Sequence, residues 1–158
     1  MYEFINADKT MYNLTNHGAF LVSGKQPNVM TISWGMIGVL WGKKVMLVPV
    51  RESRYTKKFI DITGEFTVSV PYSKMSKELL FCGKNSGRDV DKFEAMDLKR
   101  KHADRVNTYY IDGCEKHYEC KVLTSFRVES DKLPKEILDG AYKNGDFHTL
   151  YIAEILEG

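Results

Sequence analysis

The sequence has little of what several large classes of proteins depend on. It contains three cysteines, an odd number, and its opening residues, MYEFINADKT, lack the basic and then apolar order of a secretion signal. No apolar run approaches the ~20 residues that are needed to span a bilayer. We therefore expect a cytoplasmic protein with reduced thiols and without a membrane partner.

The chain also lacks an excess of charge of either sign. Its 23 basic and 21 acidic side chains give a formal net charge of +2, and the basic pairs are scattered among acids. Binding to nucleic acid requires a concentrated basic stripe, so we expect no nucleic-acid partner. A content of 43% hydrophobic and 28% charged residues is ordinary for a folded protein. The length predicts one domain, over residues 1–158, with a single sizeable core.

Motifs for metals and for nucleoside triphosphates are missing as well. Cys114, His117 and Cys120 share one short segment, CEKHYEC, but their spacing matches no paired zinc pattern. The DVD of residues 89–91 lacks the order of a calcium-binding loop. Neither a Walker A loop nor a dinucleotide fingerprint is present. The sequence therefore predicts no metal site.

The pattern that the sequence does contain is that of a mainly β protein. Seven strands are expected, over residues 19–23, 28–34, 45–50, 65–70, 106–112, 117–129 and 147–156. Short helices are expected over YTKKFIDIT with Gly64 as its stop, over SKMSKELLFCG with Ser73 as its N-cap, and in LPKEILDG after Pro134. The most economical arrangement is a β-barrel with a few short helices packed outside it.

Candidate binding residues begin in the strand over residues 28–34. Strand alternation directs Thr31 and Ser33 to the same side, with Met30, Ile32 and Trp34 on the other. The two hydroxyls either face water or line a ligand site, and the pattern alone favours water.

A helix start with arginines is the second candidate. In VPVRESRYTKKF, a buried strand ends and Arg51, Ser53, Arg54, Tyr55 and Thr56 follow. Unpaired N–H groups at a helix N-terminus suit anions, and arginine adds donors that match phosphate oxygens. A capped surface helix with solvated arginines explains the segment equally well.

The loop CGKNSGRDVDKF, residues 82–93, leaves the next expected helix. Its Gly87 is expected to need an unusual backbone angle, and Ser86, Arg88 and Lys92 supply donors and positive charge. The composition favours an anion or a polar cofactor over a metal.

Among the histidines, only His148 has a notable place, after a Gly-Asp turn and at the start of an apolar strand. No Ser-His-Asp or Cys-His arrangement supports a hydrolase.

Four stretches together resemble the flavin reductase-like, FMN-binding split-barrel family, in which flavoredoxin has the most similar character. These stretches are PNVMTISW, VPVRESRYTKKFIDITGEFTVSVP, CGKNSGRDVDKF and GDFHTLYIAEI, which occur in the family's order and spacing between residues 27 and 155. Each motif is weakly specific by itself, whereas the ordered set is fairly specific. Residues 94–116 match no motif of the family.

The resemblance implies a split β-barrel that forms a homodimer, with one FMN in each subunit near the interface. It implies that the isoalloxazine and ribityl chain lie along Asn28, Thr31, Ser33 and Trp34. The phosphate end would be held by Arg51, Arg54, Tyr55 and Thr56. The loop that closes over the cofactor would contribute Cys82, Gly83, Ser86, Gly87 and Lys92. His148 would lie near the nicotinamide, although Phe147 separates it from Asp146, where the family has Gly-Asp-His.

The function that the resemblance implies is that of an FMN-dependent oxidoreductase. NAD(P)H, or a reduced redox protein, would reduce the flavin, which passes electrons to free flavin, ferric iron or a redox partner. One alternative is a flavoredoxin-type electron carrier that binds FMN without reacting with nicotinamide. Another is a barrel that binds a different phosphorylated ligand, or haem. The sequence does not distinguish NADH from NADPH.

Overall fold

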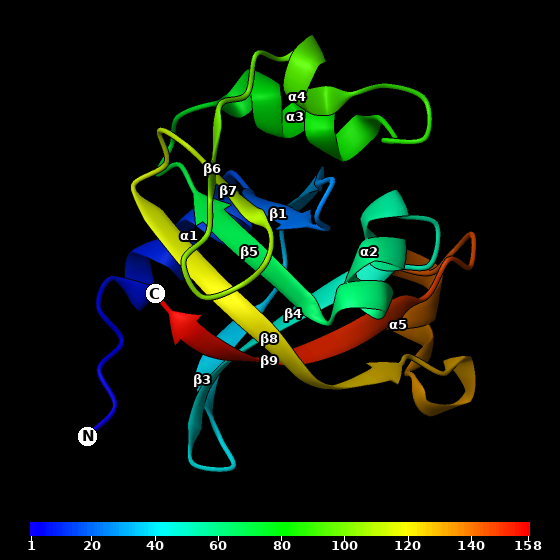
Figure 1. The fold of residues 1–158 in the computed structure, drawn as a ribbon. Coiled ribbons are helices and arrows are strands. Elements are labelled where there is room, and N and C mark those ends of the chain that lie inside the picture. Colours follow the sequence, from blue (N-terminus) through cyan, green and yellow to red (C-terminus); the bar gives the residue numbers. More distant parts are fainter.

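Seven strands form one antiparallel sheet that curls into a barrel (Figure 1). The computed structural model describes residues 1–158, and the strand order is β2-β1-β5-β8-β9-β4-β3. The bounds are Ala19–Ser23 for β1, Asn28–Ile32 for β2, Met36–Leu40 for β3, Lys43–Arg51 for β4, Glu65–Val70 for β5, Lys116–Arg127 for β8 and His148–Glu157 for β9. The two end strands, β2 and β3, do not pair with each other, so the barrel stays split between them.

Short elements surround the barrel. The helices are α1 (Ala7–Asn16), α2 (Tyr55–Thr63), α3 (Ser76–Lys84), α4 (Lys92–Ala95) and α5 (Lys135–Gly140), with one 3-10 turn, η1 (Ser130–Lys132). A separate two-stranded ribbon is formed by β6 (Arg100–His102) and β7 (Tyr109–Ile111). Helix α3 packs on β2, and α2 packs on both β1 and β2. No helix combines the length and the apolar character that crossing a membrane would require.

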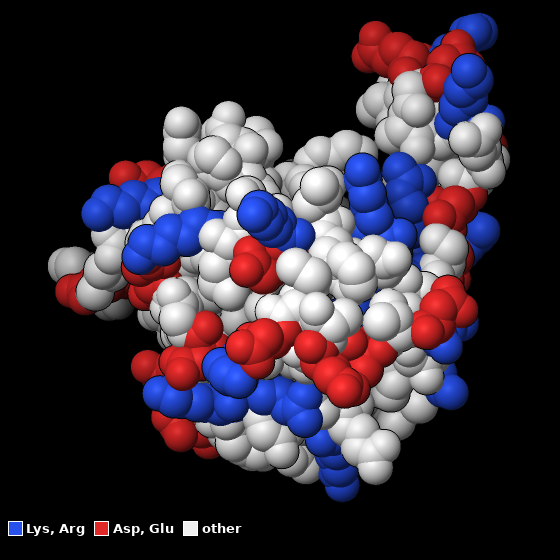
Figure 2. Space-filling view, turned by 90° about the horizontal axis from the view of Figure 1, so that it is seen from above, with Lys and Arg blue, Asp and Glu red and all other residues white.

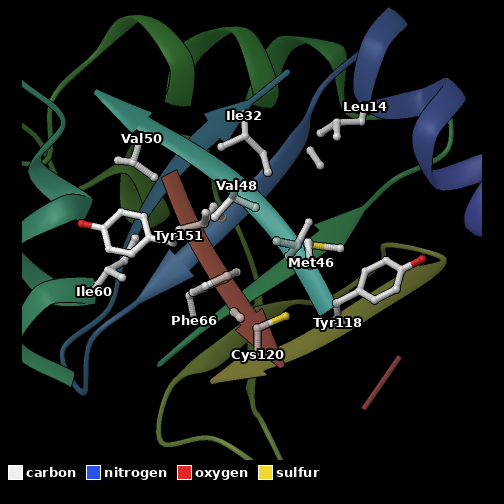
Figure 3. Close-up of a cluster of buried hydrophobic side chains, with 14 of the residues drawn as sticks. Leu14, Ile32, Met46, Val48, Val50, Ile60, Phe66, Tyr118, Cys120 and Tyr151 are labelled. Carbon is white, nitrogen blue, oxygen red and sulfur yellow. The ribbon is translucent and has the colours of Figure 1, made fainter. Parts of the chain in front are cut away.

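Two buried clusters explain why the helices stay in place. The larger cluster fills the barrel and includes Phe66, Val48 and Tyr151 (Figure 3). The smaller one lies on the other side of β1 and β2, where Phe20 and Val29 pack against α3, α4 and β7. Strand β1 is buried on both faces, which accounts for its unbroken apolar run. Each fully buried large side chain contributes about 1.5–3 kcal/mol, so the smaller cluster firmly attaches α3 and α4 to β2.

The predicted mainly β fold with short peripheral helices is confirmed, with local differences. The strand expected over residues 28–34 ends at Ile32, so Trp34 lies beyond it and is 53% exposed. Ser73 is not an N-cap, because α3 starts at Ser76 after Met75, whose φ is 57°. Gly64 ends α2 as expected, with a φ of 67° that glycine adopts without strain.

Five elements were absent from the sequence prediction: α1, α4, β3, β6 and the 3-10 turn η1. Strand β3 was missed because its residues do not alternate in burial; the strand is the edge of the sheet and is half exposed. Helix α4 is a single turn, below the length at which periodicity can be read.

Basic and acidic side chains are intermixed over the face shown in Figure 2.

Candidate functional site

Two adjoining hollows bring most of the predicted site residues together. The first, which we call the strand hollow, has a volume of about 220 Å³ and runs along the end of β2 to the start of β9. The second, the helix hollow, has about 200 Å³ and lies between the start of α2 and the end of α3. Arg54 lines both hollows, so they form one extended site. Their predicted residues are Thr31, Ser33, Trp34, Arg51, Arg54 and His148 in the strand hollow, and Arg54, Tyr55, Thr56, Ser86 and Lys92 in the helix hollow.

Four predicted residues do not line either of these two hollows but pack beneath the residues that do. Asn28 is buried and donates from Nδ2 to Oγ1 of Thr56 at 2.8 Å, which ties β2 to α2. Gly83 packs against Thr31, because a Cβ built on it would lie 3.4 Å from the Thr31 Cβ. Cys82 is fully buried beneath the site, and Gly87 packs against Asn28.

The two hydroxyls of the strand hollow differ in their environment. Thr31 is half-buried, and its Oγ1 donates to the carbonyl oxygen of Leu79 at 2.5 Å, which fastens β2 to α3. Ser33 is exposed and makes no hydrogen bond within the chain. Both line the hollow, but so does the exposed Trp34, which strand alternation placed on the opposite side; β2 ends at Ile32, so the alternation does not extend to Ser33 and Trp34. This wall therefore offers a free hydroxyl beside an aromatic surface.

Arg51 is engaged within the protein. Its Nη1 donates to the carbonyl oxygen of Asp146 and its Nη2 to that of Ala141, both at 2.9 Å. The guanidinium also lies over the ring of Tyr142, 5.4 Å from its centroid. Arg51 thus holds the loop between α5 and β9 against the end of β4.

The same loop is attached to the start of α2 through a carboxylate. Asp146 accepts from the backbone N–H of Ser53 at 2.9 Å and from its hydroxyl at 2.5 Å. Asp146 has a φ of 53°, a conformation that non-glycine residues rarely adopt and that these contacts maintain. The loop and the helix start therefore form one connected wall of the site.

Arg54 lies between the two hollows and has no carboxylate partner. Its Nη1 donates to the carbonyl oxygen of Gly83 at 2.7 Å and its Nη2 to that of Cys82 at 3.1 Å. Burial lowers the pKa of this guanidinium from its ordinary value. Such a group remains charged in proteins, so the site has a fixed positive charge at its centre.

Lys92 adds a second cation, which is more deeply buried than the half-buried Arg54. Its side chain is 3% exposed, and Nζ donates to the carbonyl oxygens of Val29 at 2.8 Å and Cys82 at 2.9 Å. Burial, and then the charge of Arg54, lower the pKa of this ammonium to about 8. Two carbonyls satisfy two of its three N–H groups, and neither cation makes an ion pair, although the charge of Asp146 acts on Arg54 from a distance. Because unbalanced buried charges are costly, an anion in the helix hollow would relieve both.

The start of α2 faces the same hollow. Its N-cap is Arg54, whose side chain makes no cap hydrogen bond, and the first N–H groups of a helix lack partners within the helix. Tyr55 and Thr56, the first two helical residues, line the hollow. The partial positive charge of the helix end adds to those of Arg54 and Lys92.

Two features order the loop CGKNSGRDVDKF, and the first of them differs from the sequence prediction. Gly87 does not have a positive φ, so the expected unusual angle is wrong. Glycine is required there because a Cβ would lie 1.9 Å from Oδ1 of Asn28. Asp91 caps α4 by accepting the N–H groups of Phe93 at 3.0 Å and Glu94 at 3.2 Å. Asp91 thus orders the loop and leaves Lys92 pointing inward.

Cys82 has the environment of a packing residue. Its thiol is fully buried, and burial raises its pKa to about 11, which disfavours the reactive thiolate. What it contributes to the site is its carbonyl oxygen, which accepts from both Arg54 and Lys92. Cys114, His117 and Cys120 do not gather into a group of metal ligands.

His148 lines the strand hollow with its ring 5.5 Å from that of Trp34. It is 6% exposed, and burial, followed by the charge of Arg51, lowers its pKa to about 4. The imidazole is therefore neutral at physiological pH. Its Nδ1 lies 2.7 Å from the hydroxyl of Tyr142, a residue that the sequence analysis did not select. Its signal in the sequence is its place three residues before the Gly145-Asp146 turn.

Comparisons with known proteins identify the family of this chain. The family model of the flavin reductase like domain matches residues 11–158. An uncharacterized protein of Archaeoglobus fulgidus is 31% identical over 155 residues, which are 98% of this chain and 76% of that protein.

Solved structures show the same fold. Flavoredoxin from Methanosarcina acetivorans has a TM-score of 0.68 at 24% identity, with 89% of this chain and 66% of that chain covered. An FMN-binding domain of a flavin reductase-like enzyme from Shewanella baltica has a TM-score of 0.65 at 20% identity, with 94% and 71% covered. This chain thus spans slightly less than two thirds of the flavoredoxin. From the match over residues 11–158 we conclude that the chain belongs to the family of flavin reductase-like domains.

Proposed function

We propose that this protein binds FMN in the two adjoining hollows and acts as an oxidoreductase. The observation that carries the proposal is a pair of cations beside the start of α2, the half-buried Arg54 and the buried Lys92, neither of which makes an ion pair. That arrangement suits the phosphate of FMN. The strand hollow, connected through Arg54, offers the Ser33 hydroxyl to the ribityl chain and Trp34 to the ring.

The chemistry of the reaction would come from the flavin, which when bound accepts and donates hydride or electrons. The residues of this chain then bind and orient it. His148 is the proposed catalytic residue, a neutral imidazole in the wall of the strand hollow that would offer an N–H donor to a flavin bound there. Arg51 and Asp146 are proposed to position His148 indirectly. They fix the loop that carries Tyr142, whose hydroxyl lies beside the imidazole.

NAD(P)H is the proposed reductant, in keeping with the description of the family as flavin reductase-like. Free flavin, ferric iron or a redox protein would accept the electrons. The structural likeness to a flavoredoxin supports a second candidate function, that of an electron carrier that does not react with nicotinamide. Anaerobic mixing of the FMN-loaded protein with NADH or NADPH separates the two, because only a reductase bleaches the flavin band.

We also propose a homodimer in the cytoplasm. Strand β3 is an unpaired edge of the sheet, and its apolar side chains Met36 and Val39 are exposed, as is Trp41 in the turn that follows. An exposed apolar edge of this kind favours association with a second copy. The three cysteines are all unpaired, in keeping with a reducing compartment. Light scattering of the purified protein measures the subunit number.

The central test is the visible spectrum of the purified protein, followed by titration of the apoprotein with FMN. Flavin bands, or uptake of FMN at micromolar concentration, support the proposal. A protein that shows neither contradicts it. The double variant Arg54→Ala, Lys92→Ala is expected to lose FMN affinity, whereas Lys99→Ala, an exposed lysine paired with Asp97, should keep it.

A further inference from the structure

Ser53 lies at the start of α2, and each of its hydrogen-bonding groups contacts another segment. Its backbone N–H donates to Oδ1 of Asp146 at 2.9 Å, and its hydroxyl donates to Oδ2 at 2.5 Å. Its carbonyl oxygen accepts from Nη1 of Arg88 at 3.0 Å. Ser53 also lines the helix hollow, next to Arg54. One residue therefore joins the loop between α5 and β9, the loop before α4 and the hollow assigned to the FMN phosphate.

The carboxylate of Asp146 takes the donors that an anion at this helix start would use. N–H groups and hydroxyls beside a helix N-terminus suit carboxylates and phosphates alike. Asp146 makes no ion pair, because Arg51 donates to its backbone carbonyl oxygen and not to its carboxylate. Burial lowers the pKa of Arg54, and the charge of Asp146 opposes that fall. A phosphate in the helix hollow and this carboxylate therefore compete for the same donors and the same positive charge.

Asp146 is also part of the segment that leads to the proposed catalytic residue. Asp146, with a φ of 53°, and Gly145, with a φ of 72°, form a tight turn just before β9. Non-glycine residues rarely adopt such angles unless contacts hold them there, and the two bonds to Ser53 are contacts of this kind. His148 follows two residues later, and its Nδ1 lies 2.7 Å from the hydroxyl of Tyr142, on the other side of the same turn. Loss of the bonds to Ser53 would therefore change how Tyr142 meets His148.

We propose that Asp146 is a positioning residue whose carboxylate a phosphate group displaces from Ser53. The carboxylate holds the donors of Ser53 and thereby the turn before β9. A phosphate monoester in the helix hollow takes over these donors, and the turn then changes the contact between Tyr142 and His148. The inference rests on the proposed function, which assigns the phosphate of FMN to that hollow. Because coupling between two contacts is reciprocal, the bonds from Ser53 to Asp146 oppose phosphate binding.

The first experiment measures ligand affinity in Asp146→Asn. The amide has the size of the carboxylate and still accepts one hydrogen bond, but it lacks the charge that competes with phosphate. The variant should bind FMN about fivefold more tightly, whereas its affinity for riboflavin, which has no phosphate, should not change. The control is Asp139→Asn, an exposed carboxylate of α5 that is paired with Lys135, and it should change neither affinity.

A contact that is only structural would give the opposite result in this experiment, because its loss loosens the wall of the site and weakens binding. Equal or weaker FMN binding in Asp146→Asn, or an equal gain for riboflavin, therefore overturns the inference. In that case the binding of FMN to the unmodified protein still upholds the proposed function. Failure of the unmodified protein to bind FMN contradicts the proposed function instead.

The second experiment uses inorganic phosphate alone, so its result does not depend on the flavin. Nitrogen NMR follows the backbone N–H of Ser53 and the imidazole of His148 while phosphate is added to the apoprotein at constant ionic strength. Both signals should shift with the same midpoint. In Asp146→Asn the His148 signal should lie close to its phosphate-bound position before phosphate is added. A shift of Ser53 without one of His148 contradicts the coupling, and the absence of any shift of Ser53 contradicts the competition for its donors.

Discussion

The hydroxyl of Tyr142 lies 2.7 Å from Nδ1 of His148. A phenol is a better donor than a neutral imidazole N–H, so Nδ1 accepts and the ring proton is on Nε2. This leaves Nε2 as the donor available to a ligand in the strand hollow. The loop that carries Tyr142 is in turn held by Arg51.

The variant Tyr142→Phe should therefore remove the preference of His148 for one tautomer while FMN binding persists. We expect one Nε2–H tautomer of His148 at pH 7 in the unmodified protein and a mixture in the variant, measured by nitrogen NMR of the imidazole. The lost hydrogen bond should cost about 1 kcal/mol of stability. Binding of FMN, whose phosphate site is elsewhere, should persist. An identical imidazole spectrum in both proteins would contradict this role of Tyr142.

Acid should destabilise the protein through His148. Its pKa falls from 6.5 in the unfolded chain to about 4 in the folded protein, so the unfolded state binds the additional proton first. Stability is complete above pH 6.5 and decreases as pH falls from 6.5 to about 4, by no more than about 3 kcal/mol. Urea denaturation across this range measures the effect, and in His148→Gln the slope should be smaller. Equal slopes would assign the acid sensitivity to other groups.

Binding of FMN should weaken at alkaline pH because of Lys92. With a pKa of about 8 in the free protein, its ammonium loses its proton above that pH and with it the charge that the phosphate needs. We expect the Kd for FMN to rise above pH 8 and to become less dependent on pH in Lys92→Met. Riboflavin, which has no phosphate, is the matched control and should bind with an affinity that does not change around pH 8. If both ligands respond alike, Lys92 does not face the phosphate.

Much of the fold was readable in the sequence, because several strands alternate apolar and polar residues with a period of two. The alternating β5 was correctly predicted in its bounds, whereas the half-exposed edge strand β3 was not seen. Among site residues, Arg54 and Thr56 were found because a helix start has a local signal. Strand β6 and its Arg100 have no such signal, since most residues that line the same hollow as Arg100 are distant from it in sequence. The absence of an ion pair at Lys92 could likewise not be read from the sequence, because it depends on tertiary packing.

The function of Gly87 can be tested by adding one methyl group. In Gly87→Ala the Cβ would lie 1.9 Å from Oδ1 of Asn28 and 3.0 Å from Cδ2 of Tyr55, so the loop or β2 must shift. Overpacking of this kind costs about 1–3 kcal/mol, and the shift should also disturb the bond from Asn28 to Thr56 at the start of α2. We therefore expect lower stability together with weaker FMN binding, measured by urea denaturation and flavin titration.

The control is Gly140→Ala in α5, where a Cβ meets nothing within 4 Å and alanine favours the helix. That variant should be as stable as the unmodified protein or slightly more so. If Gly87→Ala behaves in the same way, the contact with Asn28 does not order the loop.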